Sequence, residues 1–276
     1  MSETTEFTSI TYTVDEAVAC IGLNRQDKLN AIDRVMIGQL HQALDVVAAD
    51  PQIRVVLLHG EGKCFSSGFD LTSGEQVATT DSVYWRKELR ADFDIIMRFW
   101  DFPKPTVAAV HKYCLGGAME MALACDLTIA NDGCRFGAPE VKFGSGIVAM
   151  ILPWLTGAKA AKEFLLTGDD TISAERFLNL GLLNRVVESE QLLAESKSMA
   201  RIIASNDQLA VTLTKQAINR SYEAMGMRQA LLQGLELDVL IETGETPESK
   251  AFNKIMQEEG VKTALAWRAK QLEHSQ

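Results

Sequence analysis

The sequence predicts a layered α/β fold. In the first 200 of its 276 residues, short β-branched or wholly apolar segments alternate with longer amphipathic segments. Strands that alternate with helices in this way are typical of a sheet covered by helices. From about Arg201 the pattern changes to helices alone. A helical tail without a complete core of its own is expected to pack on the rest of its chain or on a partner subunit.

The first elements have the clearest patterns. Residues 7–23 alternate as in a β-hairpin. Asp33 is a good N-cap for an amphipathic helix that would run to about Ala49. The continuous apolar run over 53–59 is typical of a strand buried on both faces.

A glycine-rich loop over residues 60–70 comes next, and regular elements follow it. An amphipathic helix is expected over about 81–101, and a second buried strand over 106–110. Gly116-Gly117 would then open a short apolar helix over 118–124. Further strands are expected at 127–130, 135–136 and near 185–187, and the remainder is mainly helical.

Charge and composition exclude several classes of protein. The chain has 27 Lys and Arg against 37 Asp and Glu, a net charge of −10, and no basic block, which argues against nucleic acid as a main partner. No apolar run reaches the roughly 18 residues that span a bilayer, so no membrane role is expected. The five cysteines lack zinc-like spacing, so we expect no metal site and reduced, buried thiols. Together with a polar start over residues 1–6 that has no signal pattern, they favour the cytoplasm.

Two segments combine backbone donors with a carboxyl group. In residues 115–120 two glycines precede a helix, whose free N–H groups could stabilise an oxygen that becomes negative during a reaction. Glu120 would lie near the start of that helix, where it could also do no more than complement the helix dipole. In residues 136–140 apolar neighbours would desolvate Glu140 and suit it to acid–base catalysis. The alternative for Glu140 is an exposed loop carboxylate.

A third segment, residues 64–70, is built of small residues and could offer a second N–H donor, with Asp70 as a candidate helix cap. A serine nucleophile there would lack both a Gly-x-Ser-x-Gly elbow and a triad histidine. The absence of a Walker loop and of a Gly-x-Gly-x-x-Gly motif weakens nucleotide hydrolysis and dinucleotide redox chemistry. No catalytic or metal role is expected for the scattered histidines His41, His59, His111 and His274.

Taken together, these segments resemble the crotonase family, that is, the enoyl-CoA hydratase/isomerase superfamily. Each motif is weak alone, whereas the ordered set is specific for the superfamily and less specific for the reaction. The matching features cover nearly the whole chain in order: residues 24–31 (NRQDKLNA), 65–71 (FSSGFDL), 104–110 (KPTVAAV), 115–120 (LGGAME), 124–126 (ACD), 136–140 (FGAPE), 166–168 (LTG), and Ala174 with 181–183 (GLL).

The resemblance implies a crotonase-like spiral of ββα turns, with the active site, over residues 1–200. It implies a C-terminal helical trimerisation region over residues 201–276. The chain would form a homotrimer or a dimer of trimers. Its ligand would be an acyl-coenzyme A thioester, with coenzyme A entering as part of the substrate and no permanently bound cofactor.

The resemblance also implies roles for individual residues. The backbone N–H groups of Phe69 and Gly117 would bind the thioester oxygen, Glu140 would protonate C2, and Glu120 would orient and activate a water molecule. The product would be a 3-hydroxyacyl-CoA, and the activity that of an enoyl-CoA hydratase. Coenzyme A would be held by Lys28, Leu29, Ser67, Gly68, Phe69, Asp70, Leu71 and Gly117.

Departures from the family pattern leave the acyl group open. Ala118 stands where hydratases often have a third glycine, and residues 144–150 are bulkier than the usual run and lack its proline. Ala264 and Trp267-Arg268 stand where the family often offers Phe and Lys to a neighbour's coenzyme A. An apolar pocket could be lined by Tyr84, Trp85, Phe143, Met150 and Trp154.

Other activities stay open. A Δ3-Δ2 enoyl-CoA isomerase would rely chiefly on Glu140 and leave Glu120 unexplained. A dienoyl-CoA isomerase would be expected to have Asp at the positions of Glu120 and Val148. The remaining alternatives are a hydratase-lyase that cleaves its product by retro-aldol chemistry, and a catalytically silent protein that binds RNA or a protein partner. The two carboxylates and the net charge of −10 weaken the last of these.

Overall fold

The computed structural model describes residues 7–72, 81–244 and 246–273. Within these ranges its main sheet has six strands in the order β1-β2-β3-β4-β6-β9. β1 and β2 pair antiparallel as the expected hairpin, and the other neighbours are parallel. The strands are β1 (Ile10–Asp15), β2 (Val18–Leu23), β3 (Val55–Gly60), β4 (Thr106–Val110), β6 (Leu127–Asn131) and β9 (Arg185–Val187).

A second, smaller sheet lies beside the glycine-rich segments. It contains β5 (Tyr113–Leu115), β7 (Arg135–Gly137) and β8 (Ile172–Ser173), with β5 and β7 parallel. The sequence pattern predicts β7 and misses β5 and β8, which are three and two residues long. β5 leads directly into helix α3 (Gly117–Ala124), so this sheet fixes where that helix begins.

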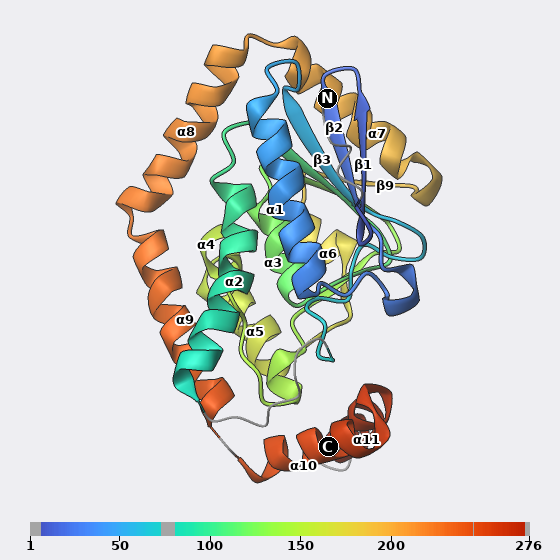
Figure 1. Cartoon of the computed structure of the whole chain (residues 1–276), viewed down its shortest axis with the longest axis vertical. Coiled ribbons are helices and arrows are strands. Elements are labelled where there is room, and N and C mark those ends of the chain that lie inside the picture. The colour runs from blue at the N-terminus through green and yellow to red at the C-terminus, as the bar shows by residue number, and fades with distance from the viewer. Residues whose placement is uncertain (1–6, 73–80, 245, 274–276) are drawn as a thin grey trace.

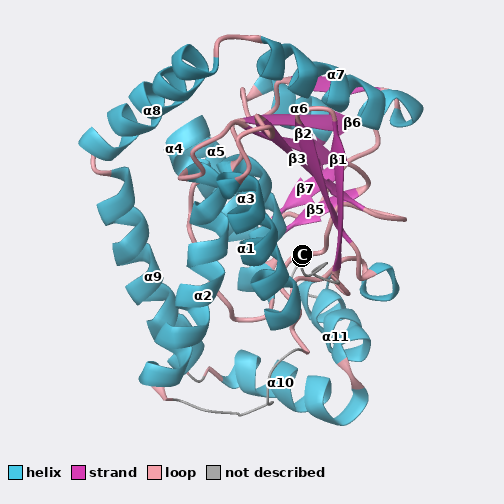
Figure 2. Cartoon of the chain, turned by 45° about the horizontal axis from the view of Figure 1, so that its top comes forward, coloured by secondary structure: helices cyan, strands magenta, loops and turns pink. Residues whose placement is uncertain are grey.

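Helices cover both faces of the main sheet, which explains why its central strands are apolar throughout. Along β2, Val18 and Cys20 pack towards α7 (Leu192–Ser205), whereas Ala19 and Ile21 belong to the larger core on the other side. That larger core is covered by α1 (Arg34–Ala49), α2 (Ser82–Trp100) and α3. Figure 2 shows α7 and these three helices on opposite sides of the sheet. The layered α/β architecture expected from the sequence is confirmed.

Helix α1 begins where its sequence predicts. The side chain of Asp33 accepts a hydrogen bond from the backbone N–H of Met36 at 2.8 Å, which satisfies one of the free donors of the first turn. Asp81 caps α2 in the same way through Val83 at 2.9 Å. The shorter helical elements are η1 (Gln26–Lys28), η2 (Glu140–Lys142), α4 (Leu152–Thr156), α5 (Ala158–Thr167), α6 (Ala174–Asn179) and η3 (Ser189–Gln191).

The last helices run along the outside of the core (Figure 1). α9 packs against α2, and the Lys215 ammonium on α8 lies 2.7 Å from the Asp126 carboxylate beside β6. Helix α7 crosses the expected boundary at residues 200/201 because Ala200 and Ala204 pack on the sheet, so the C-terminal helices that follow the sheet start with α8. These helices are α8 (Gln208–Ala224), α9 (Met227–Thr243), α10 (Pro247–Glu259) and α11 (Val261–Glu273).

The five cysteines are free and buried, as expected. Across the described ranges, no helix is both long and apolar enough to cross a membrane, and no group of three or more side chains is suited to hold a metal ion. Residues 1–6 and His274 lie outside the described residues.

Candidate active site

Glu120 lies at the start of α3 and is completely buried. Its Oε2 accepts hydrogen bonds from the backbone N–H of Ile151 at 2.7 Å and of Leu152 at 3.3 Å, where α4 begins. Its Oε1 has no hydrogen-bond partner within the described ranges. One oxygen is therefore fixed by two amides, and the other is buried without a partner in the described chain.

Glu140 comes to the same place from a different segment. It begins η2, after β7, and its Oε1 lies against Gly116, so closely that a Cβ at Gly116 would be 2.2 Å away. Gly116 has φ 55° and ψ −132°, a backbone conformation that only glycine adopts without strain. Although Glu140 as a residue is partly exposed, its Oε2 is buried and has no partner in the described part of the chain. The alternative interpretation of Glu140 as an exposed loop carboxylate is therefore wrong.

The two carboxyl groups share one environment. Burial raises the pKa of Glu120 to about 8. The two backbone N–H groups lower this pKa, and the charge of Glu140 raises it. Burial also raises the pKa of Glu140 to about 8, with a smaller contribution from the charge of Asp238. Carboxyls with such values exchange protons near neutral pH, as acid–base catalysis requires.

Two further backbone N–H groups, those of Phe69 and Gly117, belong to segments that contact each other. The residues on either side of Phe69 are hydrogen-bonded to Ile32. Gly68 O accepts from Ile32 N, and Asp70 N donates to Ile32 O, both at 2.9 Å. The Phe69 ring lies on Gly117, where an added Cβ would be 2.2 Å from Cε2. Within the described ranges neither the Phe69 nor the Gly117 amide meets an acceptor. These donors, the second at the N-terminus of α3, can bind an oxygen that gains negative charge.

Most of the residues expected to hold coenzyme A lie on two loops that hydrogen-bond to each other. Lys28 is exposed at the end of η1, and Leu29 follows in a left-handed conformation with φ 52°. Ser67 N donates to Leu29 O at 3.0 Å, so the loop that contains Lys28 runs beside residues 66–70. Leu71 is also exposed.

Asp70 holds this loop together through its side chain. Its carboxylate lies 2.9 Å from Arg25 and accepts from the Thr72 hydroxyl at 2.6 Å. Arg25 also reaches Asp33 at 3.1 Å and donates to Ala31 O at 2.7 Å. The Asp70 side chain is thus already engaged, and the part it could offer a ligand is its backbone.

The C-terminal helices close over the segment that follows Glu140. Phe143 stacks on Phe252 of α10, with ring centroids 5.5 Å apart, and Ala264 of α11 is buried. Arg268 donates to Lys142 O of the same chain. Of the other expected pocket residues, Tyr84 and Trp85 contact each other edge to face, and Met150 and Trp154 pack on the core.

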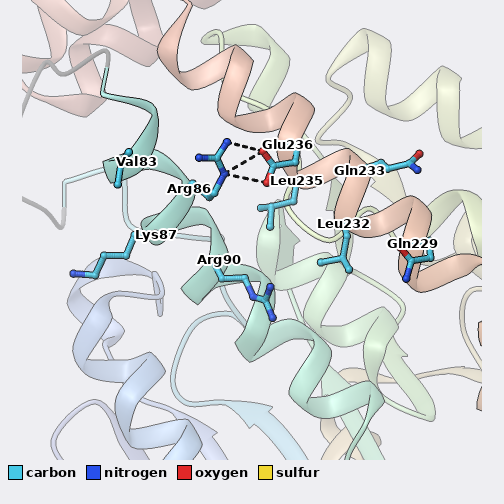
Figure 3. A pocket seen from close by; sticks show the side chains of 9 residues that line it. All are labelled: Val83, Arg86, Lys87, Arg90, Gln229, Leu232, Gln233, Leu235 and Glu236. Atoms are coloured by element: carbon cyan, nitrogen blue, oxygen red, sulfur yellow. Dashed lines mark hydrogen bonds and ion pairs between the residues drawn. The ribbon is translucent and has the colours of Figure 1, made fainter.

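A separate groove of about 630 Å³ lies between α2 and α9 (Figure 3). Arg86 and Glu236 face each other across it at 2.7 Å and so tie the two helices together. None of the residues expected to act in catalysis or to hold coenzyme A lines it. The lining residues are Val83, Arg86, Lys87, Arg90, Gln229, Leu232, Gln233, Leu235 and Glu236.

Sequence reasoning missed three features of the site. The amides of Ile151 and Leu152 fix Glu120, yet backbone donors leave no signal in a residue pattern. Gly116 was singled out only as one of two glycines, not as the surface on which Glu140 rests. Asp238 of α9 lies near Glu140 although 98 residues separate them, and it looks like any polar residue of an amphipathic helix.

The fold, two buried carboxyls and a pair of free amides define an acyl-thioester enzyme of the crotonase type. The sequence profile of the enoyl-CoA hydratase/isomerase family matches residues 13–263. The chain belongs to this family, as its motifs predict.

Individual relatives agree with this assignment. A putative enoyl-CoA hydratase from Thermus thermophilus is 36% identical over 239 residues, which cover 85% of this chain and 94% of the relative. A short-chain-enoyl-CoA hydratase from Clostridium acetobutylicum is 33% identical over 254 residues, covering 90% and 89%. The crystal structure of an enoyl-CoA hydratase/isomerase from Xanthobacter autotrophicus Py2 superimposes with a TM-score of 0.94 at 45% identity, covering 96% of this chain and 99% of that one. The chain is an enzyme of the crotonase superfamily, and the expected fold is confirmed.

Proposed function

We propose that this protein is an enoyl-CoA hydratase, which adds water across the C2=C3 bond of a 2-enoyl-CoA to give a 3-hydroxyacyl-CoA. The observation that carries the proposal is the meeting of the Glu120 and Glu140 carboxyls in one buried site. The contact between Phe69 and Gly117, whose amides meet no acceptor in the described ranges, supports a paired oxygen-binding site near them. Several relatives named as hydratases support the same activity.

The two amides make the double bond reactive. Attack of water at C3 moves electrons towards the thioester oxygen, which gains negative charge. The N–H groups of Phe69 and Gly117 bind this oxygen, and a donor in such a position contributes about 3–4 kcal/mol to the transition state. The N-terminus of α3 adds a partial positive charge at the same point.

The surroundings of the two glutamates assign their roles. Glu120 receives two backbone N–H bonds, which favour its charged form, so it accepts a proton from the attacking water. Glu140 Oε2 is buried and, in the described chain, has no hydrogen-bond donor to stabilise a negative charge, so Glu140 holds a proton and gives it to C2. Hydroxide adds to C3, and one proton returns from Glu120 to Glu140 before the next turnover.

The adenosine part of coenzyme A is proposed to lie on the edge formed by Lys28, Leu29 and residues 67–71. Lys28 supplies an exposed positive charge beside backbone groups of two adjacent loops. No metal ion and no permanently bound cofactor takes part in the proposed reaction. The buried free thiols fit a reducing compartment, and we place the enzyme in the cytoplasm.

The active form is proposed to be a homotrimer or a dimer of trimers. Large apolar side chains lie exposed on the outer sides of α8 and α9, where a second copy of the chain would cover them. These side chains are Leu209, Leu213 and Ile218 on α8, Met225 directly after it, and Leu237, Leu240 and Ile241 on α9.

The test is hydration of a panel of 2-enoyl-CoA esters, followed as loss of the absorbance of the conjugated thioester. Glu120→Gln and Glu140→Gln are expected to abolish hydration while a saturated acyl-CoA still binds. Glu236→Gln, the same change at an exposed site, serves as control. If the wild-type protein hydrates no ester but converts a 3-enoyl-CoA, the activity is that of an isomerase and the proposal is wrong. Release of acetyl-CoA and an aldehyde would instead identify a hydratase-lyase.

A further inference from the structure

Asp238 is a buried acid that the proposed mechanism does not use. It lies on the inner face of α9 with 2% of its surface exposed, and within the described ranges neither carboxylate oxygen makes a hydrogen bond. Buried carboxyls are normally paired, because their loss of water is otherwise uncompensated. An unpaired one so close to a catalytic acid needs an explanation.

The position of Asp238 connects α9 to the loop that follows Glu140. Its Oδ1 is so close to Gly146 that a Cβ there would lie 2.0 Å away. One turn further along α9, Glu242 accepts a hydrogen bond from the Ser145 hydroxyl. Ser145 N in turn donates to Glu140 O at 3.1 Å. On one face of α9, Asp238 and Glu242 therefore contact Gly146 and Ser145, which follow the turn that begins at Glu140.

The charged groups around Asp238 are almost all acidic. Glu242 faces it from α9, Asp92 from α2 and Glu140 from η2. The only positive charge in this group, among the described residues, belongs to Arg34 of α1, and it is already paired with Asp92. The Gly146 amide faces the acids from the loop, without a well-formed bond to Asp238. Ionisation of one of these acids therefore disfavours ionisation of the others.

We propose that Asp238 is a positioning residue for Glu140: from α9 it packs against Gly146 in the loop that follows this glutamate, and its negative charge acts on the Glu140 carboxyl. This inference rests on the proposed hydratase reaction, in which Glu140 must be protonated to deliver a proton to C2. A negative charge at Asp238 favours the protonated form of Glu140, while Glu120, fixed by two amides, remains the base. Asp238 thus keeps the two glutamates in different protonation states.

The test compares kcat/KM against pH for Asp238→Asn and the wild type. The amide keeps the size of the side chain and removes its charge, so Glu140 should ionise at lower pH. The fall in activity on the alkaline side is then expected to move to lower pH by about one unit. The matched control is Glu236→Gln, an exposed acid on the same helix, paired with Arg86 across the groove of Figure 3, for which no shift is expected.

A loss of activity by the same factor at every pH, without movement of the alkaline limb, would overturn the proposal, because a purely structural role has that signature. Thermal unfolding shows whether Asp238→Asn still folds, and its Tm is expected to equal or exceed that of the wild type, since an unpaired buried acid is removed. If the wild type hydrates no ester, the proposed function fails separately. The carboxyl of Glu140 can then be titrated directly by carbon-13 NMR, and an unchanged titration in Asp238→Asn would refute the coupling.

Discussion

The contact between Gly117 and Phe69 allows a sharp test of the paired amide donors. A Cβ on Gly117 would lie 2.2 Å from Cε2 and 2.4 Å from Cδ2 of the Phe69 ring. Carbon atoms pack best at about 3.5–4.0 Å, so in Gly117→Ala the ring must retreat by roughly 1.5 Å. Gly117 is not among the glycines with positive φ, so alanine brings no backbone strain of its own.

The Phe69 ring packs against the core, so we expect its retreat to shift the backbone of Phe69 and with it one of the two amide donors. Loss of a single donor in a comparable site lowers kcat by about 10²–10³, or about 3–4 kcal/mol. We therefore expect Gly117→Ala to lower kcat for hydration about 100-fold, with a smaller change in the dissociation constant of a saturated acyl-CoA. The measurements are initial rates of loss of the conjugated-thioester absorbance and a calorimetric titration.

Gly38→Ala is the matched control. Gly38 is exposed on α1, and nothing lies within 4 Å of the position of an added Cβ. The same substitution there is expected to leave kcat unchanged and to stabilise the fold by about 0.5–1 kcal/mol, because glycine is a poor helix former. Wild-type kcat in a folded Gly117→Ala protein would show that the two amides do not act together on the substrate.

Further predictions concern the acids, the loops and the assembly. Glu120→Gln and Glu140→Gln are each expected to lower kcat about 10²–10⁴-fold, and equal loss of ligand binding would contradict this. Because burial raises the pKa of Glu140 from 4.5 to about 8, the folded state holds a proton that the unfolded chain releases, and stability falls as pH rises through this window. The Tm advantage of Glu140→Gln over wild type should therefore grow between about pH 5 and pH 8, as calorimetry would measure. Arg25→Met should weaken the binding of a coenzyme A ester, because Arg25 joins the loops of Asp33 and Asp70. An unchanged affinity would contradict this prediction. Leu240→Asp should shift a trimer towards monomers in light scattering, and an unaltered mass would exclude α9 from the interface.

Elements governed by local chemistry could be predicted from the sequence. Asp33 caps α1 at the expected position, and the apolar strand over 106–110 has the bounds that its pattern predicts. The helix cap and the strand both depend on residues a few positions away along the chain, and the sequence pattern contains this local information. Strands β5 and β8 were missed because a strand of two or three residues is defined by its partner in the sheet.

The sequence by itself determined which residues are available for chemistry: two glycines before a helix, and carboxyls at positions 120 and 140 in an ordered set of motifs. Only the tertiary structure decided that these carboxyls are desolvated and adjacent, that Gly116 gives Glu140 its place, and that Asp238 comes beside it from α9. The physical reason is that the acidity of a carboxyl depends on the water it has lost and the charges it faces. Both are set by segments far away along the chain, and they exist only when the chain is folded.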